Sequence, residues 1–330
     1  MKTIKIKFVG YWKDMKPESQ MIYRILSEYY DVKICDEPDY IICSCFSPYY
    51  EYCKYPQVRI MAEGENFIPD FNFIDYVICP YPIHFQDRCF YKPGCFDSFG
   101  HALSLEKEKE KKDLSFINNK IFFANFIASH ESEYGIRGDF FKKLSQYKRV
   151  ESPGSYLKNT VDSVVWTDNS KTDFQRKCKF TLCFESTKHE GFVTEKITDA
   201  FFADTIPIYY GSDTVKEIFN PKAFINISDF KSWDDAVEYI IKIDNDDKMY
   251  LDMINQPILN DGNYFTKLKK SLEECILNIF EQPIEKSYRR SRVYAPMAHE
   301  VFIKDCIDNN VKNYSIKKLL KAIFKKIKRK

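Results

Sequence analysis

Residues 179–212 read KFTLCFESTKHEGFVTEKITDAFFADTIPIYYGS, and their pattern decides the fold of the chain. Phe180–Phe184 is a short run of β-prone apolar residues, which predicts a buried strand. Another apolar run within residues 203–212 predicts a second strand. Between them, four apolar residues recur at i, i+4, i+7 and i+8, the spacing of a helix face packed on a sheet: Val193, Ile197, Ala200 and Phe201. The stretch therefore predicts a strand, a polar loop, a helix and a strand.

The predicted helix begins near residues 191–194, and its first turn carries Glu195 and Lys196. A helix N-terminus presents unpaired backbone N–H groups and the positive end of the helix dipole. Such an end suits phosphate groups, so we expect a phosphorylated ligand here. An ordinary βαβ packing unit with charged helix ends explains the periodicity equally well.

Two segments of this stretch match a known signature. Residues 191–197 read GFVTEKI, and residues 205–212 read TIPIYYGS. Together they closely resemble the signature of the α1,3/α1,4-fucosyltransferases, which transfer fucose from GDP-fucose to glycans that contain N-acetylglucosamine. The match is long and free of gaps, and the resemblance extends over roughly residues 58–285. It implies the GT-B architecture, in which two Rossmann-like domains face each other across the active-site cleft.

The rest of the chain alternates β-prone and helical runs, which predicts an α/β fold with parallel sheets. Strands are predicted at 4–9, 32–35, 40–45, 58–61, 76–79, 120–126 and 223–227, and helices at 19–29, 137–146 and from 228 or 229 to 243. The first strand ends in Gly10-Tyr11-Trp12 and lacks a glycine-rich fingerprint, so the nucleotide is expected in the second half.

A charged run, LEKEKEKK at residues 105–112, cannot form a core and is interpreted as an interdomain linker or an exposed helix within it. We therefore predict a Rossmann-like domain at residues 1–115 and a second one at 116–285. From the resemblance, the first would bind the acceptor and the second GDP-fucose. Residues 286–330 are predicted to form a C-terminal extension.

The composition indicates a globular chain without a membrane span. The 330 residues suffice for two domains of ordinary size, and 44% of them are hydrophobic. The eleven cysteines are irregularly spaced without a CxxC pair, and the first residues alternate like a strand instead of forming a signal peptide. We therefore expect reduced thiols and a cytoplasmic protein. No apolar run is long enough to cross a bilayer.

Residues 312–330 differ in character from the body of the chain. They contain nine Lys or Arg residues and no acidic residue, and six apolar side chains fall on one helical face: Ile316, Leu319, Leu320, Ile323, Phe324 and Ile327. This pattern is typical of a helix that lies on an anionic membrane surface, here the inner face of the cell membrane. A solvated helix packed on the body is the alternative. No basic patch with interleaved aromatics occurs elsewhere, so no nucleic-acid partner is expected.

Sugar transfer from a nucleotide requires a cation for the departing diphosphate and a base for the incoming hydroxyl. Lys196 is the first candidate for the diphosphate, and Arg137 in GIRGD (135–139) is the second, because a guanidinium can hold two phosphate oxygens. The resemblance implies that both bind the GDP moiety and that Glu195 accepts hydrogen bonds from sugar hydroxyls. Without it, Arg137 is interpreted as a surface arginine and Glu195 as a residue that complements the helix dipole.

The resemblance also places Ser186, Phe192 and Val193 among the donor-binding residues. Ser186 and Phe192 depart from the family pattern, in which the corresponding segments resemble Glu-Asn-Thr and Gly-Tyr-Val. An amide and a phenol hydroxyl are therefore missing from the expected donor contacts.

The base is expected in the first half of the chain. Residues 59–66 read RIMAEGEN, so a strand ends in Gly-Glu-Asn, and active sites of α/β proteins collect at the carboxyl ends of strands. The catalytic glutamate of the family lies in this Gly-Glu-Asn, followed by a Phe-Asn-x-x-Asp-Tyr pattern that occurs here at Phe71–Tyr76. Glu65 is therefore the expected base, and Glu63 is the alternative if the strand register differs. A solvated glutamate at a strand end is the other interpretation.

No metal or cofactor is expected. Asp244-Asn245-Asp246-Asp247 superficially resembles a metal-binding triplet, but a polar turn at a helix end explains it better. His84 and His189 lack ligand spacing. The family resembles the metal-independent glycosyltransferases, which leaves the charge of the diphosphate to Lys196 and Arg137.

The resemblance thus implies an inverting fucosyltransferase that uses GDP-β-fucose and a glycan acceptor of the N-acetyllactosamine type. It would form an α1,3 linkage, with α1,4 as the alternative. Two alternatives remain. The chain could be a different sugar-nucleotide transferase of the same architecture, or a non-catalytic relative that binds glycans or membranes.

Overall fold

A computed structural model describes residues 1–46, 50–161, 163–164 and 169–308. The predicted tail helix at residues 312–330 lies outside the described residues. The chain divides into two compact units. The first unit comprises Met1–Cys79, Ile83–Phe90 and Glu273–Lys330, and the second comprises Pro80–Pro82 and Tyr91–Leu272.

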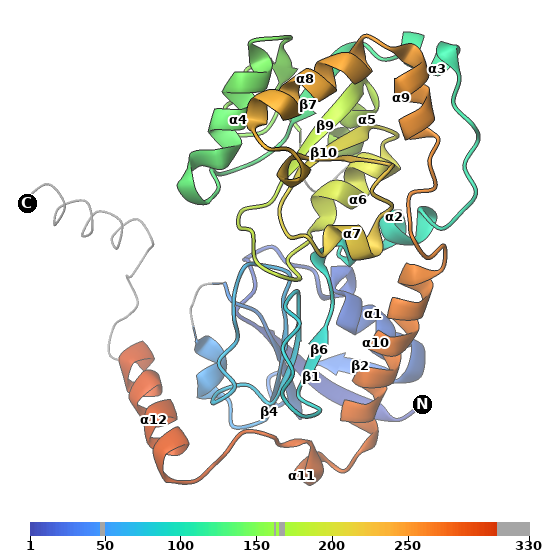
Figure 1. Cartoon of the computed structure of the whole chain (residues 1–330). Coiled ribbons are helices and arrows are strands. Elements are labelled where there is room, and N and C mark those ends of the chain that lie inside the picture. The colour runs from blue at the N-terminus through green and yellow to red at the C-terminus, as the bar shows by residue number, and fades with distance from the viewer. Residues whose placement is uncertain (47–49, 162, 165–168, 309–330) are drawn as a thin grey trace, which may run out of the picture. The chain divides into compact units, whose positions relative to one another are not determined.

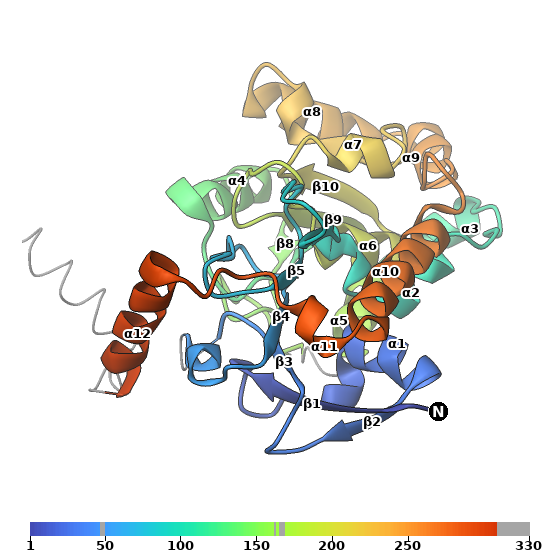
Figure 2. The same ribbon diagram turned by 90° about the horizontal axis from the view of Figure 1, so that it is seen from below.

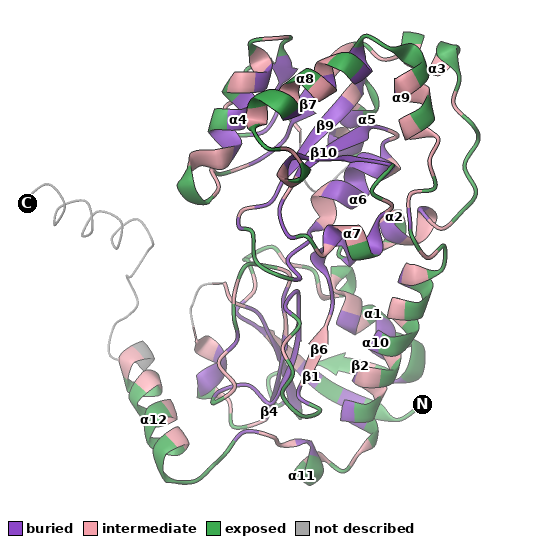
Figure 3. Ribbon diagram, viewed as in Figure 1, coloured by how far each residue is buried: buried purple, intermediate pink, exposed green. Residues whose placement is uncertain are grey.

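The first unit is built on a six-stranded sheet (Figure 1). Its strands are β1 (Thr3–Val9), β2 (Asp31–Ile34), β3 (Tyr40–Cys43), β4 (Val58–Ala62), β5 (Tyr76–Cys79) and β6 (Cys89–Tyr91), in the order β2-β1-β3-β4-β5-β6. The pairs from β2 through β5 are all parallel. Every residue of β3 and β5 is buried, as expected for the central strands of a parallel sheet covered on both faces (Figure 3).

Helices from both ends of the chain belong to this unit. They are α1 (Met21–Tyr29), the end of α10 (Tyr264–Glu281), α11 (Ile284–Ser287) and α12 (Tyr294–Asp308), of which α12 contacts the 3₁₀ turn at Glu51–Lys54. Phe280 of α10 packs on Tyr40 of β3, with ring centroids 4.4 Å apart, and also contacts Tyr30 at the end of α1. The last part of α10 therefore lies beside α1 (Figures 1 and 2).

The second unit contains a five-stranded parallel sheet. Its strands are β7 (Phe122–Phe126), β8 (Val150–Glu151), β9 (Cys178–Phe184), β10 (Ile206–Tyr210) and β11 (Ile225–Asn226), in the order β11-β10-β9-β7-β8. Its helices are α2 (Phe99–Ser104), α3 (Leu114–Asn118), α4 (Ile136–Ser145), α5 (Ser170–Arg176), α6 (Glu195–Phe202), α7 (Val215–Ile218), α8 (Trp233–Asp244), α9 (Asp247–Ile254) and the first part of α10. Aromatic side chains such as Phe126, Phe140 and Phe184 fill the core between sheet and helices.

The predicted fold class of two parallel, Rossmann-like α/β units is confirmed, and most predicted strands and helices lie within two residues of the observed ones. One helix begins later than predicted, because Ile227–Asp229 forms a separate 3₁₀ turn. The hydroxyl of Ser232 then accepts a hydrogen bond from the backbone N–H of Asp235, which fixes the start of α8 at Trp233.

The observed units divide at different places from the predicted domains. The first division falls at residues 79–91 instead of 115/116, and the second at 272/273 instead of 285/286. The charged run at 105–112 lies within the second unit, where Lys109 and Lys112 both pair with Asp204, at 2.9 and 3.0 Å. These lysines thus attach the segment to the body of the unit. The prediction of an interdomain linker here was wrong, because a high density of charged residues does not by itself indicate a linker.

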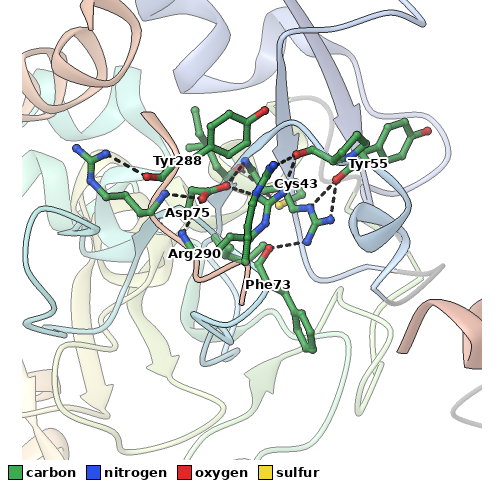
Figure 4. Close-up of polar contacts among 12 residues, drawn as sticks. Cys43, Tyr55, Phe73, Asp75, Tyr288 and Arg290 are labelled. Atoms are coloured by element: carbon green, nitrogen blue, oxygen red, sulfur yellow. Dashed lines mark hydrogen bonds and ion pairs between the residues drawn. The ribbon is translucent and has the colours of Figure 1, made fainter. Parts of the chain in front are cut away.

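A buried cluster joins the C-terminal segment to the sheet of the first unit. We call it the Asp75 cluster, and it consists of Arg59, Asp75, Arg290 and Glu300. The Asp75 carboxylate accepts hydrogen bonds from the backbone N–H groups of Arg59 (2.9 Å) and Arg290 (2.9 Å), and it pairs with the Arg290 guanidinium (Figure 4). The Arg59 side chain donates to the carbonyls of Tyr55 and Phe73 and pairs with Glu300 of α12.

Candidate active site

The start of α6 is tied to the end of β9 by a buried carboxylate. Glu185 directly follows β9 and is 1% exposed. One of its oxygens accepts a hydrogen bond from the backbone N–H of Thr194 and the other from the Thr194 hydroxyl, both at 2.7 Å. These bonds close the loop between the strand and the helix, and they hold the residue that precedes α6 in place.

Gly191 in this loop has to be glycine. Its φ is +80°, and a Cβ added there would lie 2.5 Å from Cδ of Pro82 and 2.9 Å from the carbonyl oxygen of Pro80. Its carbonyl accepts a hydrogen bond from the Tyr91 hydroxyl at 3.1 Å. The glycine of the signature therefore allows a close approach of two backbone segments.

Lys196 presents a cation at the start of α6. Its Nζ donates to the Thr194 hydroxyl at 2.9 Å and lies 3.4 Å from Glu185 and 3.6 Å from Glu195, while 21% of its side chain is exposed. Burial disfavours the ammonium, but the carboxylates of Glu195 and Glu185 outweigh it and raise the pKa of Lys196. The group therefore stays charged at neutral pH and remains accessible from solvent.

Glu195, the first residue of α6, stays ionised for the complementary reason. Burial would raise its pKa, but the positive charges of Lys196 and Lys171 outweigh burial and lower it. Its side chain is 30% exposed. The start of α6 thus carries adjacent, accessible groups of opposite charge.

Arg137 lies in the first turn of α4 and reaches the same end of β9. Its Nε and Nη2 donate to the carbonyl of Phe184 at 3.0 and 2.8 Å, and its Nη1 donates to the carbonyl of His130 at 2.9 Å. A guanidinium has five N–H groups, so these bonds fix its position and leave further donors for a ligand. Burial lowers the pKa of Arg137, against the opposing effect of nearby Glu185 and Glu195.

Arg137, Glu185, Glu195 and Lys196 form a group that we call the α6 cluster. The structure therefore brings together three residues that the sequence placed in one site, together with Glu185, which was not singled out. A helix N-terminus with two cations beside it suits a diphosphate.

The other predicted donor-binding residues are placed differently. The Phe192 ring is buried and stacks on Tyr81, with centroids 5.9 Å apart. Val193 is fully buried, and its carbonyl accepts a hydrogen bond from the backbone N–H of Cys95. Ser186 is half-buried, and its carbonyl accepts from the backbone N–H of Glu133. The side chains of Phe192 and Val193 thus shape the loop from inside.

In the first unit, Glu63 and Glu65 follow the end of β4 and differ in environment. Glu63 is buried, and one of its oxygens accepts hydrogen bonds from the Ser44 hydroxyl (2.6 Å) and the backbone N–H of Cys45 (2.9 Å). The other accepts from the backbone N–H groups of Gly64 and Glu65, both at 2.9 Å. Glu65 is exposed at the tip of the loop that Glu63 holds. Of the two candidates for a base, only Glu65 has an accessible carboxylate.

The acidic segment at residues 244–247 has structural contacts. Asp244 is buried at the end of α8, where it pairs with Lys179 at 2.7 Å and accepts from the Tyr147 hydroxyl at 2.9 Å. Asp246 accepts from the backbone N–H of Met249 at the start of α9. Within residues 1–46, 50–161, 163–164 and 169–308, no three His, Cys, Asp or Glu side chains are grouped to hold a metal ion. The eleven cysteines all lie within the described residues, and they form no disulfide.

Comparison with known protein families gives matches along most of the chain. The model of the alpha-(1,3)-fucosyltransferase FucT N-terminal domain matches residues 6–95, and that of the glycosyltransferase family 10 (fucosyltransferase) C-terminal domain matches residues 97–255. The chain belongs to glycosyltransferase family 10. This agrees with the resemblance found in the signature of residues 191–212.

Relatives of this family 10 member include an alpha-(1,3)-fucosyltransferase of Helicobacter pylori. It is 32% identical over 321 residues, which cover 86% of this chain and 66% of the Helicobacter protein. A 4-galactosyl-N-acetylglucosaminide 3-alpha-L-fucosyltransferase of Mus musculus is 32% identical over 39% of this chain and 35% of its own length. The chain thus spans about two thirds of the first relative and about a third of the second.

Solved structures agree with the sequence relatives. A crystal structure of an alpha1,3-fucosyltransferase has a TM-score of 0.71 and 28% identity, and the match covers 89% of this chain and 93% of that one. One with GDP-fucose gives a TM-score of 0.68 over 84% and 91%. The Anabaena HepE protein, at 8% identity and a TM-score of 0.51, shares the fold alone. The chain therefore has the predicted GT-B fold class.

Among the helices that the structure describes, none is both long and apolar enough to cross a membrane.

Proposed function

We propose that this family 10 member is an inverting fucosyltransferase that moves L-fucose from GDP-β-L-fucose to a hydroxyl of an N-acetyllactosamine-type glycan. The expected linkage is α1,3, with α1,4 as the alternative. The observation that carries the proposal is the meeting of Arg137, Glu195 and Lys196 at one end of the second sheet. The names of the relatives and the GDP-fucose complex of a similar structure support it.

The proposed reaction has one displacement step. Glu65 takes the proton of the acceptor hydroxyl as its oxygen forms a bond to the anomeric carbon of fucose. The bond between that carbon and the β-phosphate oxygen breaks on the opposite face, and GDP leaves with the electron pair. Attack opposite the leaving group converts the β-linked donor into an α-linked product.

Each proposed role follows from an environment described above. Lys196 and Arg137 offset the charge that develops on the departing diphosphate, because both are fixed cations near the start of α6. Glu195 accepts hydrogen bonds from fucose hydroxyls, since it is ionised and partly exposed. Ser186, Phe192 and Val193 would keep the loop between β9 and α6 in the shape that these contacts require.

The deciding experiment is incubation of the full chain with GDP-fucose on a glycan array. Transfer to N-acetyllactosamine-type glycans, with linkage assigned by NMR, is expected. Parallel incubations with other sugar nucleotides test the alternative of a different transferase. Transfer from another donor, or GDP-fucose binding without transfer to any glycan, would overturn the proposal.

We also propose that the reaction needs no metal or cofactor. The support is the pair of cations, Lys196 and Arg137, at the expected place of the diphosphate. Turnover measured after dialysis against EDTA is expected to match turnover with added Mg²⁺ or Mn²⁺. Loss of turnover on chelation and recovery with one of these ions would refute this.

We further propose that residues 312–330 attach the protein to anionic lipid at the inner face of the membrane. The support is their sequence, with nine basic residues beside a six-residue apolar stripe. Removal of these residues should abolish sedimentation with anionic vesicles and leave turnover on a soluble acceptor near the wild-type value. Unchanged sedimentation would rule the attachment out.

A further inference from the structure

A buried lysine outside the family signature lies beside α6. Lys171, in the first turn of α5, is 7% exposed, and its Nζ lies 2.6 Å from Oδ2 of Asp199. The other oxygen of Asp199 lies 2.7 Å from Nδ1 of His101, a residue of α2. The His101 ring in turn stacks on Phe202, with centroids 3.8 Å apart and 11° between the planes. Side chains from α2, α5 and α6 therefore meet at one carboxylate.

This carboxylate belongs to the same helix face as Glu195. Asp199 follows Glu195 by four residues on α6, and side chains at that spacing are neighbours. Two carboxylates so placed repel each other. The positive charge of Lys171 acts on both carboxylates, whose pKa values burial alone would raise. It is the leading cause that lowers the pKa of Asp199, and it adds to the larger effect of Lys196 in lowering the pKa of Glu195.

Other charged groups surround Glu195 from several elements. Lys196 lies next to Glu195 on α6, Glu185 lies at the end of β9, and Arg137 of α4 interacts with Glu195 through its charge. His101 of α2 acts through Asp199. Asp97, paired with Lys92, follows the 3₁₀ turn at Gly94–Phe96 that packs against the start of α6. Lys171 differs from Lys196 because it is buried, whereas part of the Lys196 side chain is exposed.

We propose that Lys171 is a positioning residue for fucosyl transfer, which holds the Glu195 carboxylate ionised and in place by sharing its charge between Glu195 and Asp199. The inference rests on the proposed function, in which Glu195 binds the fucose hydroxyls. It assigns Lys171 no contact with the donor. Its effect should therefore concern the sugar and leave the nucleotide contacts of Lys196 and Arg137 intact.

The test compares Lys171→Met with the wild-type full chain by calorimetry, using GDP-fucose and GDP between pH 5.5 and pH 8. Methionine keeps much of the length of lysine but not its charge. Loss of that charge raises the pKa of Glu195, so the carboxyl is partly protonated at the acidic end and ionised again at pH 8. We expect GDP-fucose affinity to fall about tenfold at pH 5.5 and less than about threefold at pH 8.

Two comparisons separate this effect from loss of structure. The affinity for GDP should change by the same small factor at each pH, because the terminal phosphate, with a pKa of about 6, titrates equally in both proteins. Lys171→Arg keeps the charge and should restore the wild-type pH profile. If Lys171→Met does not fold, Lys171→Gln, which can still hydrogen-bond Asp199, takes its place.

Lys179→Met serves as the matched control. Lys179 is also a largely buried lysine paired with an aspartate, Asp244, but it lies at the opposite end of β9 from Glu185. Lys179→Met should lower the stability of the protein and leave the pH profile of GDP-fucose binding unchanged. A wild-type profile in Lys171→Met, or equal losses for GDP and GDP-fucose at every pH, would overturn the inference. Failure of the wild type itself to bind GDP-fucose would instead refute the proposed function.

Discussion

The Asp75 cluster of the first unit and the α6 cluster of the second both combine carboxylates with cations, but they differ in how their charges are satisfied. In the Asp75 cluster, the side chains of Arg59, Asp75 and Arg290 are at most 2% exposed, and their donors and acceptors are bonded largely to the backbone (Figure 4). In the α6 cluster, Lys196 and Glu195 remain partly exposed at a helix start. The first arrangement holds chain segments together, whereas the second leaves charge for a ligand.

The same difference recurs over two residues at the end of β4. Glu63 is buried with four hydrogen bonds that organise the loop, and Glu65 is exposed on that loop. A buried acceptor with its bonding capacity in use contributes stability, and an accessible one can take a proton. Each prediction below tests one side of this contrast.

Glu65→Gln should have the largest effect. Glutamine keeps the shape and the hydrogen-bonding capacity of the side chain but cannot act as a base, so turnover should fall by about 10²–10⁴-fold. GDP-fucose affinity, measured by calorimetry, should stay near the wild-type value, because the proposed donor contacts lie on α4 and α6.

Glu63→Gln is the matched comparison for that variant. It removes a buried charge that accepts four hydrogen bonds, so it should lower the thermal unfolding midpoint, which Glu65→Gln should not. Near-wild-type turnover in Glu65→Gln together with an inactive, fully stable Glu63→Gln would move the base to Glu63.

Asp75→Asn tests the buried side of the contrast. The substitution leaves the buried guanidinium of Arg290 without its carboxylate, a change that costs about 3–5 kcal/mol of unfolding free energy. Urea denaturation measures it. Asp87→Asn is the control, since Asp87 pairs with the adjacent Arg289 but is 44% exposed, and it should cost at most about 1 kcal/mol. Equal losses in the two variants would show that burial does not set the strength of this cluster.

Much of the fold could be predicted from the sequence because its strands are short apolar runs between helical ones. The apolar run Phe180–Phe184 predicted β9, and the apolar face that contains Ile197 and Phe201 predicted α6, since burial on a parallel sheet leaves a periodic pattern. The unit boundaries could not be predicted in this way. The end of α10 packs on the first sheet through the contact of Phe280 with Tyr40. The sequence of α10 alone does not show which of the two sheets the helix packs on.

The candidate site shows the same limit. Arg137, Glu195 and Lys196 were predicted because the signature and the helix start mark them. Glu185 stands in the quoted stretch, but only the fold shows that it bonds to Thr194. Lys171 and His101 are separated in sequence from Asp199 by 28 and 98 residues, so no spacing pattern connects them. Phe192 and Val193 show the converse: the signature predicted them as donor-binding residues, but the structure places their side chains in the interior.

Lys196→Ala tests the accessible side of the contrast. Loss of a charge-assisted contact to the diphosphate should weaken GDP binding by about 1.5–3 kcal/mol and lower turnover with it. Lys188→Ala, in the same loop but exposed and 3.9 Å from Asp213, should leave GDP affinity unchanged. Equal GDP affinity of Lys196→Ala and wild type in calorimetry would remove Lys196 from the nucleotide site.

The smallest expected effect concerns a third carboxylate, Asp244, which is buried as Asp75 is but pairs with the exposed Lys148 as well as with the largely buried Lys179. Burial alone would raise its pKa, yet the bonds from Lys148 and Lys179 outweigh burial and hold it below the ordinary value. A carboxyl with a lower pKa in the folded state stabilises the protein above its unfolded pKa of about 3.9, and this stabilisation is lost as the pH falls through the folded value. The difference in unfolding free energy between wild type and Asp244→Asn should therefore be constant from pH 7 to about pH 5 and shrink below about pH 4.

Urea denaturation at each pH measures this difference. The control is Glu238→Gln on the exposed face of the same helix, whose unfolding free energy should lie within about 0.5 kcal/mol of the wild-type value. A difference that stays constant down to pH 2.5 would mean that Asp244 contributes through its shape and hydrogen bonds and not through its charge.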